Sequence, residues 1–231
     1  SKVADVTRSK GTLDHVIREA TVRFKSLIDR SEPRRPLVGI NGEIFLRSNR
    51  FSNSDLVREC EKVGLEVIVS PVAEWFKYIG HRNIEDGVMD RDLKRIIRGQ
   101  IRNLFLAKDE RTVSASFDEF VDGKDPTPKE LLKLSGQYLS PKCGGEAVLS
   151  IGAGIEWLED PRFAGVISVM PHGCMPGGTV AAMSEKLSAK HGKPWINLTY
   201  DGILETNNQV RISNFAEVIR YCRKGSPLAS S

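Results

Sequence analysis

Four short apolar runs alternate with stretches of helical periodicity, and this alternation restricts the chain to a small group of folds. The runs cover residues 37–40, 65–69, 165–169 and 195–199, and each ends in a turn of small or polar residues. Strands that are separated by helices favour a parallel sheet with right-handed crossovers. We therefore predict an α/β fold, with a Rossmann-like or flavodoxin-like parallel sheet of about four strands and flanking helices.

The middle of the chain has a different pattern. From about residue 88 to residue 120 there is no strand candidate, and apolar residues recur at helical spacing: Leu93, Ile96, Ile97, Ile101, Leu104 and Phe105. We expect a helical insertion at about 85–140 within an α/β domain that covers residues 37–225. An amphipathic pattern predicts an N-terminal helix within residues 1–36, and the Ser-rich residues 226–231 are expected to form a disordered tail. Thr127, Pro128 and Glu130 form a capping-box pattern that predicts a further helix start.

The composition is that of an ordinary globular chain. Hydrophobic residues make up 40% and charged residues 28%, and no run approaches the roughly 20 apolar residues that cross a bilayer. The N-terminus has no hydrophobic signal core, so we expect a cytoplasmic protein without a membrane partner. The net charge of +4 is compatible with an anionic ligand but gives no reason to expect nucleic acid. There is no Gly-Lys-Ser/Thr phosphate loop, so we expect no ATP site in this chain.

The turn after the third apolar run is the most informative candidate site. It reads Met-Pro-His-Gly-Cys-Met-Pro-Gly-Gly over residues 170–178 and precedes a helical pattern. Ligands of open α/β sheets lie beyond the carboxyl ends of the strands, where this turn would be. The positive end of a following helix suits a thiolate ligand or nucleophile at Cys174, although a buried loop thiol fits the composition equally well. His172 belongs to the same turn, but its spacing does not establish a Cys–His pair.

Polar residues after the first and fourth runs would share this edge of the sheet. Glu43, Arg47 and Asn49 follow the first run, and an Arg there can hold a carboxylate or phosphate with two hydrogen bonds. The alternative is a loop that local Asx and Arg hydrogen bonds stabilise. Tyr200 and Asp201 follow the fourth run, in a turn that would shape a ligand pocket. Asp201 is a candidate to bind a hydroxylated ligand or to orient a cluster, with a helix N-cap as the alternative role.

The four cysteines show no paired CxxC spacing, which argues against a disulfide framework and a self-contained zinc site. Cys143 lies in a small-residue turn before a helix and is either a second metal ligand or an incidental loop thiol. Cys60 lies on the apolar stripe of its helix, and Cys222 lies near the end of the last helix, so we expect both to belong to the core.

Taken together, the motifs resemble a known group. The chain is similar to the activase-associated proteins related to the 2-hydroxyacyl-CoA dehydratases, often called CoA-substrate-specific enzyme activases, which are related to the dehydratase subunits and the double-cubane-cluster proteins. The resemblance covers about residues 37–221. It rests on residues 38–44 (Val-Gly-Ile-Asn-Gly-Glu-Ile), 47–49 (Arg-Ser-Asn), 145–147 (Gly-Glu-Ala), 170–177 (Met-Pro-His-Gly-Cys-Met-Pro-Gly), 200–202 (Tyr-Asp-Gly) and 205–207 (Glu-Thr-Asn).

The resemblance implies an oxygen-sensitive iron–sulfur system of anaerobic metabolism. In such systems an ATP-hydrolysing activator drives a low-potential electron to a subunit with Rossmann-like domains and a [4Fe–4S] or related cluster. Cys174 matches a cluster-ligand position, with Cys143 as the candidate second ligand. The implied partners are the ATPase activator module, as a separate subunit or a missing N-terminal part, and a CoA-thioester enzyme, with a homodimer left open.

A cluster usually takes four thiolates, and these two cysteines do not complete a site. We therefore expect the chain to be a fragment of a larger polypeptide that is neither catalytic nor loaded with an intact cluster when it is alone. The alternative is a non-redox α/β domain that binds an anion, a CoA ligand or a partner protein at the same edge of the sheet. A third option is an enzyme with Cys174 as its nucleophile.

Overall fold

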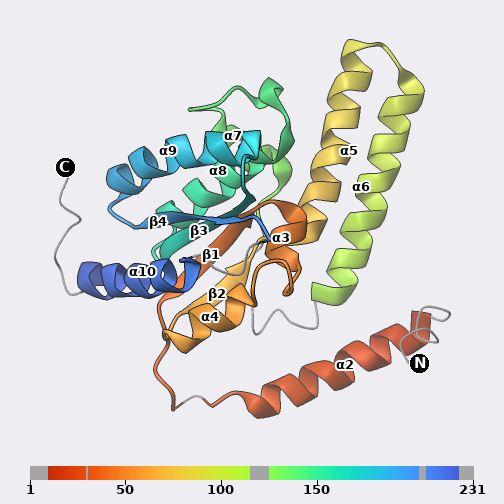
Figure 1. The fold of residues 1–231 in the computed structure, drawn as a ribbon. Coiled ribbons are helices and arrows are strands. Elements are labelled where there is room, and N and C mark those ends of the chain that lie inside the picture. The colour runs from red at the N-terminus through yellow and green to blue at the C-terminus, as the bar shows by residue number, and fades with distance from the viewer. Residues whose placement is uncertain (1–9, 30, 115–124, 203–206, 224–231) are drawn as a thin grey trace. The chain divides into compact units, whose positions relative to one another are not determined.

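The computed structural model describes residues 10–29, 31–114, 125–202 and 207–223. By its internal contacts the chain forms two compact units, one made of Arg35–Tyr78 and Pro126–Ser231 and the other of Ser1–Arg34 and Ile79–Asp125. The first unit holds a sheet with helices around it, and the described part of the second unit is helical (Figure 1). The tail expected at residues 226–231 lies outside the described residues.

The sheet has four parallel strands, as the sequence predicts. They are β1 (Leu37–Gly42), β2 (Glu66–Val69), β3 (Phe163–Pro171) and β4 (Trp195–Tyr200), in the spatial order β2-β1-β3-β4. From β1 the chain moves outward to β2, and from β3 it moves outward in the opposite direction to β4. The boundary between β1 and β3 is therefore the topological switch point, where α/β sheets bind their ligands.

Helices cover both faces of the sheet (Figure 1). On one face, α7 (Pro128–Ser135), α8 (Gly145–Glu159) and α9 (Met175–His191) enclose one apolar cluster, and a short 3-10 helix, η1 (Pro141–Cys143), leads into α8. On the other face, α3 (Ile44–Ser48), α4 (Leu56–Lys62) and α10 (Asn208–Arg223) enclose a second cluster. The predicted capping box is present at the start of α7, where Thr127 and Glu130 bond to each other's backbone N–H groups.

Helix α8 is buried along almost its whole length because it packs between the sheet and α7. Two glycines allow this close approach. A Cβ at Gly152 would lie 2.4 Å from the carbonyl oxygen of Leu131 in α7, and a Cβ at Gly154 would lie 2.0 Å from the Trp195 ring on β4. Packing of α8 this close to the sheet fixes its N-terminal end at the carboxyl edge of β1 and β3.

The helical unit contains α2 (Lys10–Leu27), the greater part of α5 (Val72–Met89), and α6 (Leu93–Ser114). A helical stretch thus separates β2 from β3, as predicted. Helices α5 and α6 pack closely, since a Cβ at Gly99 would lie 2.9 Å from the carbonyl oxygen of Gly80. No helix in the described part of the chain combines the length and apolar character needed to cross a membrane.

Candidate functional site

A small crevice opens at the switch point between β1 and β3. The N-terminal ends of α8 and α9 form its sides, and its cavity volume is only about 10 Å³, about enough for one water molecule. Its lining consists of Gly42, Glu43, Glu146, Ala147, Ser150, Ser168, Val169, Met170, Cys174, Pro176, Gly177 and Val180. The crevice therefore contains the Cys174 turn together with one of the polar residues predicted for the first strand, Glu43.

Cys174 is the N-cap residue of α9 and is half-buried. Its backbone N–H donates to the Pro171 carbonyl (3.2 Å), and its carbonyl accepts from the Gly178 N–H (2.8 Å). The thiol makes no capping hydrogen bond to the helix. Gly177 lets the first turn of α9 approach β3, because a Cβ there would lie 2.7 Å from the Met170 Cβ. The backbone thus holds Cys174 firmly while its sulfur stays available at the crevice.

Two carboxylates form the opposite side of the crevice. Glu43 caps α3, and its oxygens accept from the N–H groups of Phe45 (3.0 Å) and Leu46 (2.7 Å). Glu146, in the first turn of α8, accepts from the Ile44 N–H (3.2 Å). Burial raises the pKa of Glu146 and the nearby Glu43 acts in the same direction, whereas the hydrogen bond from Ile44 and the charge of Arg47 oppose this shift. This side of the crevice is acidic, which disfavours an anionic ligand.

Arg47 is buried beneath this acidic side and does not line the crevice. Its guanidinium donates to the carbonyl oxygens of Gly42 (3.0 Å) and Pro71 (3.3 Å) and lies 3.9 Å from Glu74. Burial lowers the pKa of Arg47, and the neighbouring carboxylates, Glu74 first, partly offset that effect. Arg47 therefore holds the ends of β1 and β2 together. This favours the alternative in which arginine hydrogen bonds stabilise the loop.

The remaining predicted residues lie apart from the crevice lining. Asn49 is the C-cap residue of α3, where its side chain accepts from the Ser52 N–H (3.0 Å). His172 is exposed, and its backbone N–H donates to the Tyr200 carbonyl (3.1 Å), which joins the turns after β3 and β4. Asp201 is exposed just after β4. None of these three residues therefore contributes a side chain to the crevice lining.

The Tyr200 side chain belongs to the opposite face of the sheet, in the apolar cluster with α4 and α10. Burial raises the pKa of its phenol, and Cys60 and Glu59 add to this effect. Tyr200 lines a second hollow, with a cavity volume of about 90 Å³. The sheet thus separates Tyr200 from Cys174, so the two predicted turns do not build one pocket.

The cysteines differ sharply in their surroundings, and none forms a disulfide. Cys60 is buried, and burial with two neighbouring glutamates raises its pKa to about 12. Cys143 is exposed in η1, and Cys222 is half-buried on α10. Of the four, only Cys174 lines the crevice. Within the described residues, no three His, Cys, Asp or Glu side chains gather as a metal site would require.

Several crevice residues were missed at the sequence level. The indole N–H of Trp195 donates to the Ser168 hydroxyl (2.9 Å), and Ser168 donates in turn to the side-chain oxygen of Asn41. Asn41 donates to the Ser150 carbonyl (2.9 Å), so this chain of hydrogen bonds connects Ser168 and Ser150, two residues of the crevice lining. Glu146 was part of the Gly-Glu-Ala motif but was not predicted as a site residue, although a carboxylate in a helix's first turn directly after two glycines is a signal for one.

Comparisons of the chain with protein-family models, with curated proteins and with solved structures found no match.

Proposed function

We propose that this domain supplies Cys174 as a ligand to an iron–sulfur cluster in an electron-transfer protein of the 2-hydroxyacyl-CoA dehydratase activase type. The observation that carries the proposal is the position of Cys174. Its thiol is half-buried, makes no capping bond and lines the crevice at the switch point, on the N-cap of a 17-residue helix. A thiolate at a helix N-terminus is stabilised by the helix dipole and the unpaired N–H groups.

The acidic side of the crevice argues against a CoA ligand at this place. The phosphates of a CoA ligand would meet the carboxylates of Glu43 and Glu146, and the nearby Arg47 is already bonded to backbone carbonyls. Negative charge beside a cluster makes the addition of an electron less favourable and so lowers the reduction potential. An activator that hydrolyses ATP could supply the electron that a cluster of low reduction potential needs.

The described residues do not by themselves complete a cluster site. A cluster of the [4Fe–4S] type takes about four thiolates, and the crevice provides one. Cys143 remains the candidate second ligand, from the turn just before α8. In this proposal the other ligands come from a further part of the protein, a second copy or a partner. When bound, the cluster would supply one-electron transfer between an ATPase activator and a CoA-thioester enzyme.

The proposal is tested by anaerobic reconstitution with iron and sulfide in the presence of excess 2-mercaptoethanol, which replaces the missing thiolates. Iron per chain and visible charge-transfer absorption are measured after desalting for the wild type, Cys174→Ala, Cys143→Ala and Cys222→Ala. Cys222 is the matched control because it is also half-buried but lies on α10. We expect the wild type and Cys222→Ala to retain iron and Cys174→Ala to lose it, with an intermediate loss for Cys143→Ala.

Without external thiol we expect no intact cluster, because the chain lacks a complete ligand set. Brown colour and stoichiometric iron in such a sample would contradict that expectation. The redox proposal itself fails if no variant retains iron in the presence of thiol, or if Cys174→Ala retains as much as the wild type. A non-redox binding domain would then be the better account of the crevice.

A further inference from the structure

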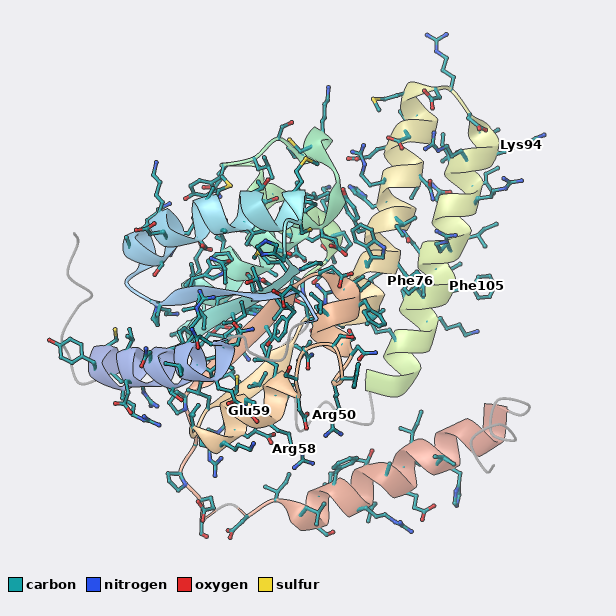
Figure 2. The ribbon with its side chains drawn as sticks, viewed as in Figure 1. Arg50, Arg58, Glu59, Phe76, Lys94 and Phe105 are labelled. Carbon is teal, nitrogen blue, oxygen red and sulfur yellow. The ribbon has the colours of Figure 1, made fainter. Side chains whose placement is uncertain are left out.

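One side of α6 carries an apolar stripe beside a row of basic residues, and both are exposed. The stripe consists of Leu93, Ile97, Ile101, Leu104 and Phe105, each at least 45% exposed, and the row consists of Lys94, Arg98 and Arg102. Figure 2 shows Phe105 and Lys94 pointing away from α5. We call these eight residues the α6 outer face.

The apolar stripe lies on a different side of α6 from the residues that pack on α5. That inner side includes Gly99, where a Cβ would lie 2.7 Å from the Ile84 side chain. The stripe runs from Leu93 to Phe105, a length of about 18 Å at the rise of an α-helix. A helix that packed only against α5 would be polar on its other side. A continuous exposed apolar surface of this kind is typical of an interaction site.

The charge of the α6 outer face is one-sided. Residues 93–108 contain no Asp or Glu. Arg95, outside the row, is neutralised by Asp86 (2.8 Å) and Asp90 (3.0 Å). In contrast, Lys94, Arg98 and Arg102 take part in no ion pair within the described part of the chain. Among the described residues, the basic row therefore has no counter-charge, and the apolar stripe beside it is exposed.

We propose that the α6 outer face binds an amphipathic helix of a partner protein whose apolar stripe is flanked by carboxylates. Apolar side chains at helical spacing would supply the contact area, and the acidic flank would set partner choice and register against Lys94, Arg98 and Arg102. The class of partner follows from charge complementarity and helical geometry, independently of the cluster proposal.

Three other occupants match the α6 outer face less well. Antiparallel pairing of two copies through this face would bring the two basic rows together. Helix α2 has more basic than acidic side chains among its described residues, namely Arg18, Arg23 and Lys25 against Glu19. An anionic membrane would meet headgroups along both edges of the stripe, but the basic row lies on one edge only, and the face has no Trp or Tyr.

The test uses a fluorescein-labelled helical peptide with a leucine stripe flanked by glutamates, and a matched peptide with lysines in place of the glutamates. We expect the wild-type chain to bind the acidic peptide, with an affinity that falls as salt rises, and not the basic one. The reversal K94E/R98E/R102E should weaken binding of the acidic peptide by roughly tenfold or more. Leu104→Ala with Phe105→Ala should also weaken it, with the circular dichroism spectrum unchanged.

The matched control is K129E/K133E/K186E, which has the same net charge but changes exposed lysines of the sheet unit. It should bind the acidic peptide as the wild type does. Equal binding of both peptides, no binding, or full binding by K94E/R98E/R102E would overturn the proposal. Two further results would overturn the proposal. One is that the wild type sediments with phosphatidylserine vesicles and K94E/R98E/R102E does not. The other is that the wild type is a dimer in ultracentrifugation and that K94E/R98E/R102E or L104A/F105A changes this dimer.

Discussion

Helices α8 and α6 are both rich in apolar residues, yet the described chain buries one and leaves a side of the other exposed. Ile151 in α8 is fully buried, whereas Ile101 in α6 is 50% exposed. Helix α8 is apolar around its circumference and has glycines where α7 and β4 come close. Helix α6 has an inner side for α5 and an outer face of mixed apolar and basic character. Apolar residues around the whole helix therefore support the fold in α8, whereas in the more highly charged α6 part of them form a candidate surface for a partner.

The two helices should differ most in how much stability the chain loses when one isoleucine is replaced by alanine. Ile151→Ala should lower the free energy of unfolding by about 2–5 kcal/mol, because it leaves a cavity between the sheet and α7. Ile101→Ala should change it by no more than about 0.5 kcal/mol, since the side chain is half-exposed. Urea denaturation followed by circular dichroism measures both. Similar losses of unfolding free energy in the two variants would show that the α6 outer face is covered within the chain.

A smaller effect is expected when a methyl group is added to a glycine. Gly154→Ala should destabilise the fold by about 1–3 kcal/mol, because the new Cβ would overlap the Trp195 ring. Gly178→Ala in α9 is the matched control, since a Cβ there meets nothing within 4 Å. That variant should be neutral or gain up to about 1 kcal/mol from helix propensity. Thermal melts of the two variants compare them directly, and a stable Gly154→Ala variant would mean that α8 packs less tightly than described.

The smallest change in stability is expected at Glu146, at the N-terminal end of α8, where the helix lines the crevice. Burial raises the pKa of Glu146, so the folded chain holds this proton to higher pH than the unfolded chain does. The resulting loss of folding stability is absent below the ordinary glutamate pKa of about 4.3 and grows as the pH rises toward the raised pKa of Glu146 in the folded chain. Glu146→Gln keeps an acceptor for the Ile44 N–H but has no charge to bury. Between about pH 4 and pH 7, its free energy of unfolding should therefore fall less than that of the wild type. The difference between the two should be under about 1 kcal/mol.

Urea melts across this pH range test the effect, with Glu185→Gln as the control because Glu185 is exposed on α9. Glu185→Gln should follow the wild type. If Glu146→Gln follows it too, the carboxylate of Glu146 is not destabilised by its place in the crevice.

The fold was largely predictable because its signals are local. The apolar runs gave all four strands to within two residues at each end, and the Thr127–Glu130 pattern marked the start of α7. The position of Cys174 beyond β3, just before a helix, followed from the order of these elements. Each of these features depends on neighbouring residues and on the rules that join strands to helices.

The orientation of side chains at the site was not predictable in the same way. Arg47 follows a strand, but its inward position depends on the carbonyl of Pro71 and on Glu74, which lie more than 20 residues further along. Alternation along β4 places Tyr200 on the same face as Leu198. The sequence does not tell which face holds the crevice, because that depends on how α8 and α9 pack.

Whether Cys174 holds a redox-active cluster is tested most directly by electron paramagnetic resonance of the thiol-supplemented, reconstituted chain. The sample is reduced with titanium(III) citrate, a strong reductant, because the carboxylates at the crevice are expected to lower the reduction potential. We expect the signal of a reduced iron–sulfur cluster in the wild type and in Cys222→Ala, and its loss in Cys174→Ala. No signal in the wild type, or the same signal in Cys174→Ala, would contradict it.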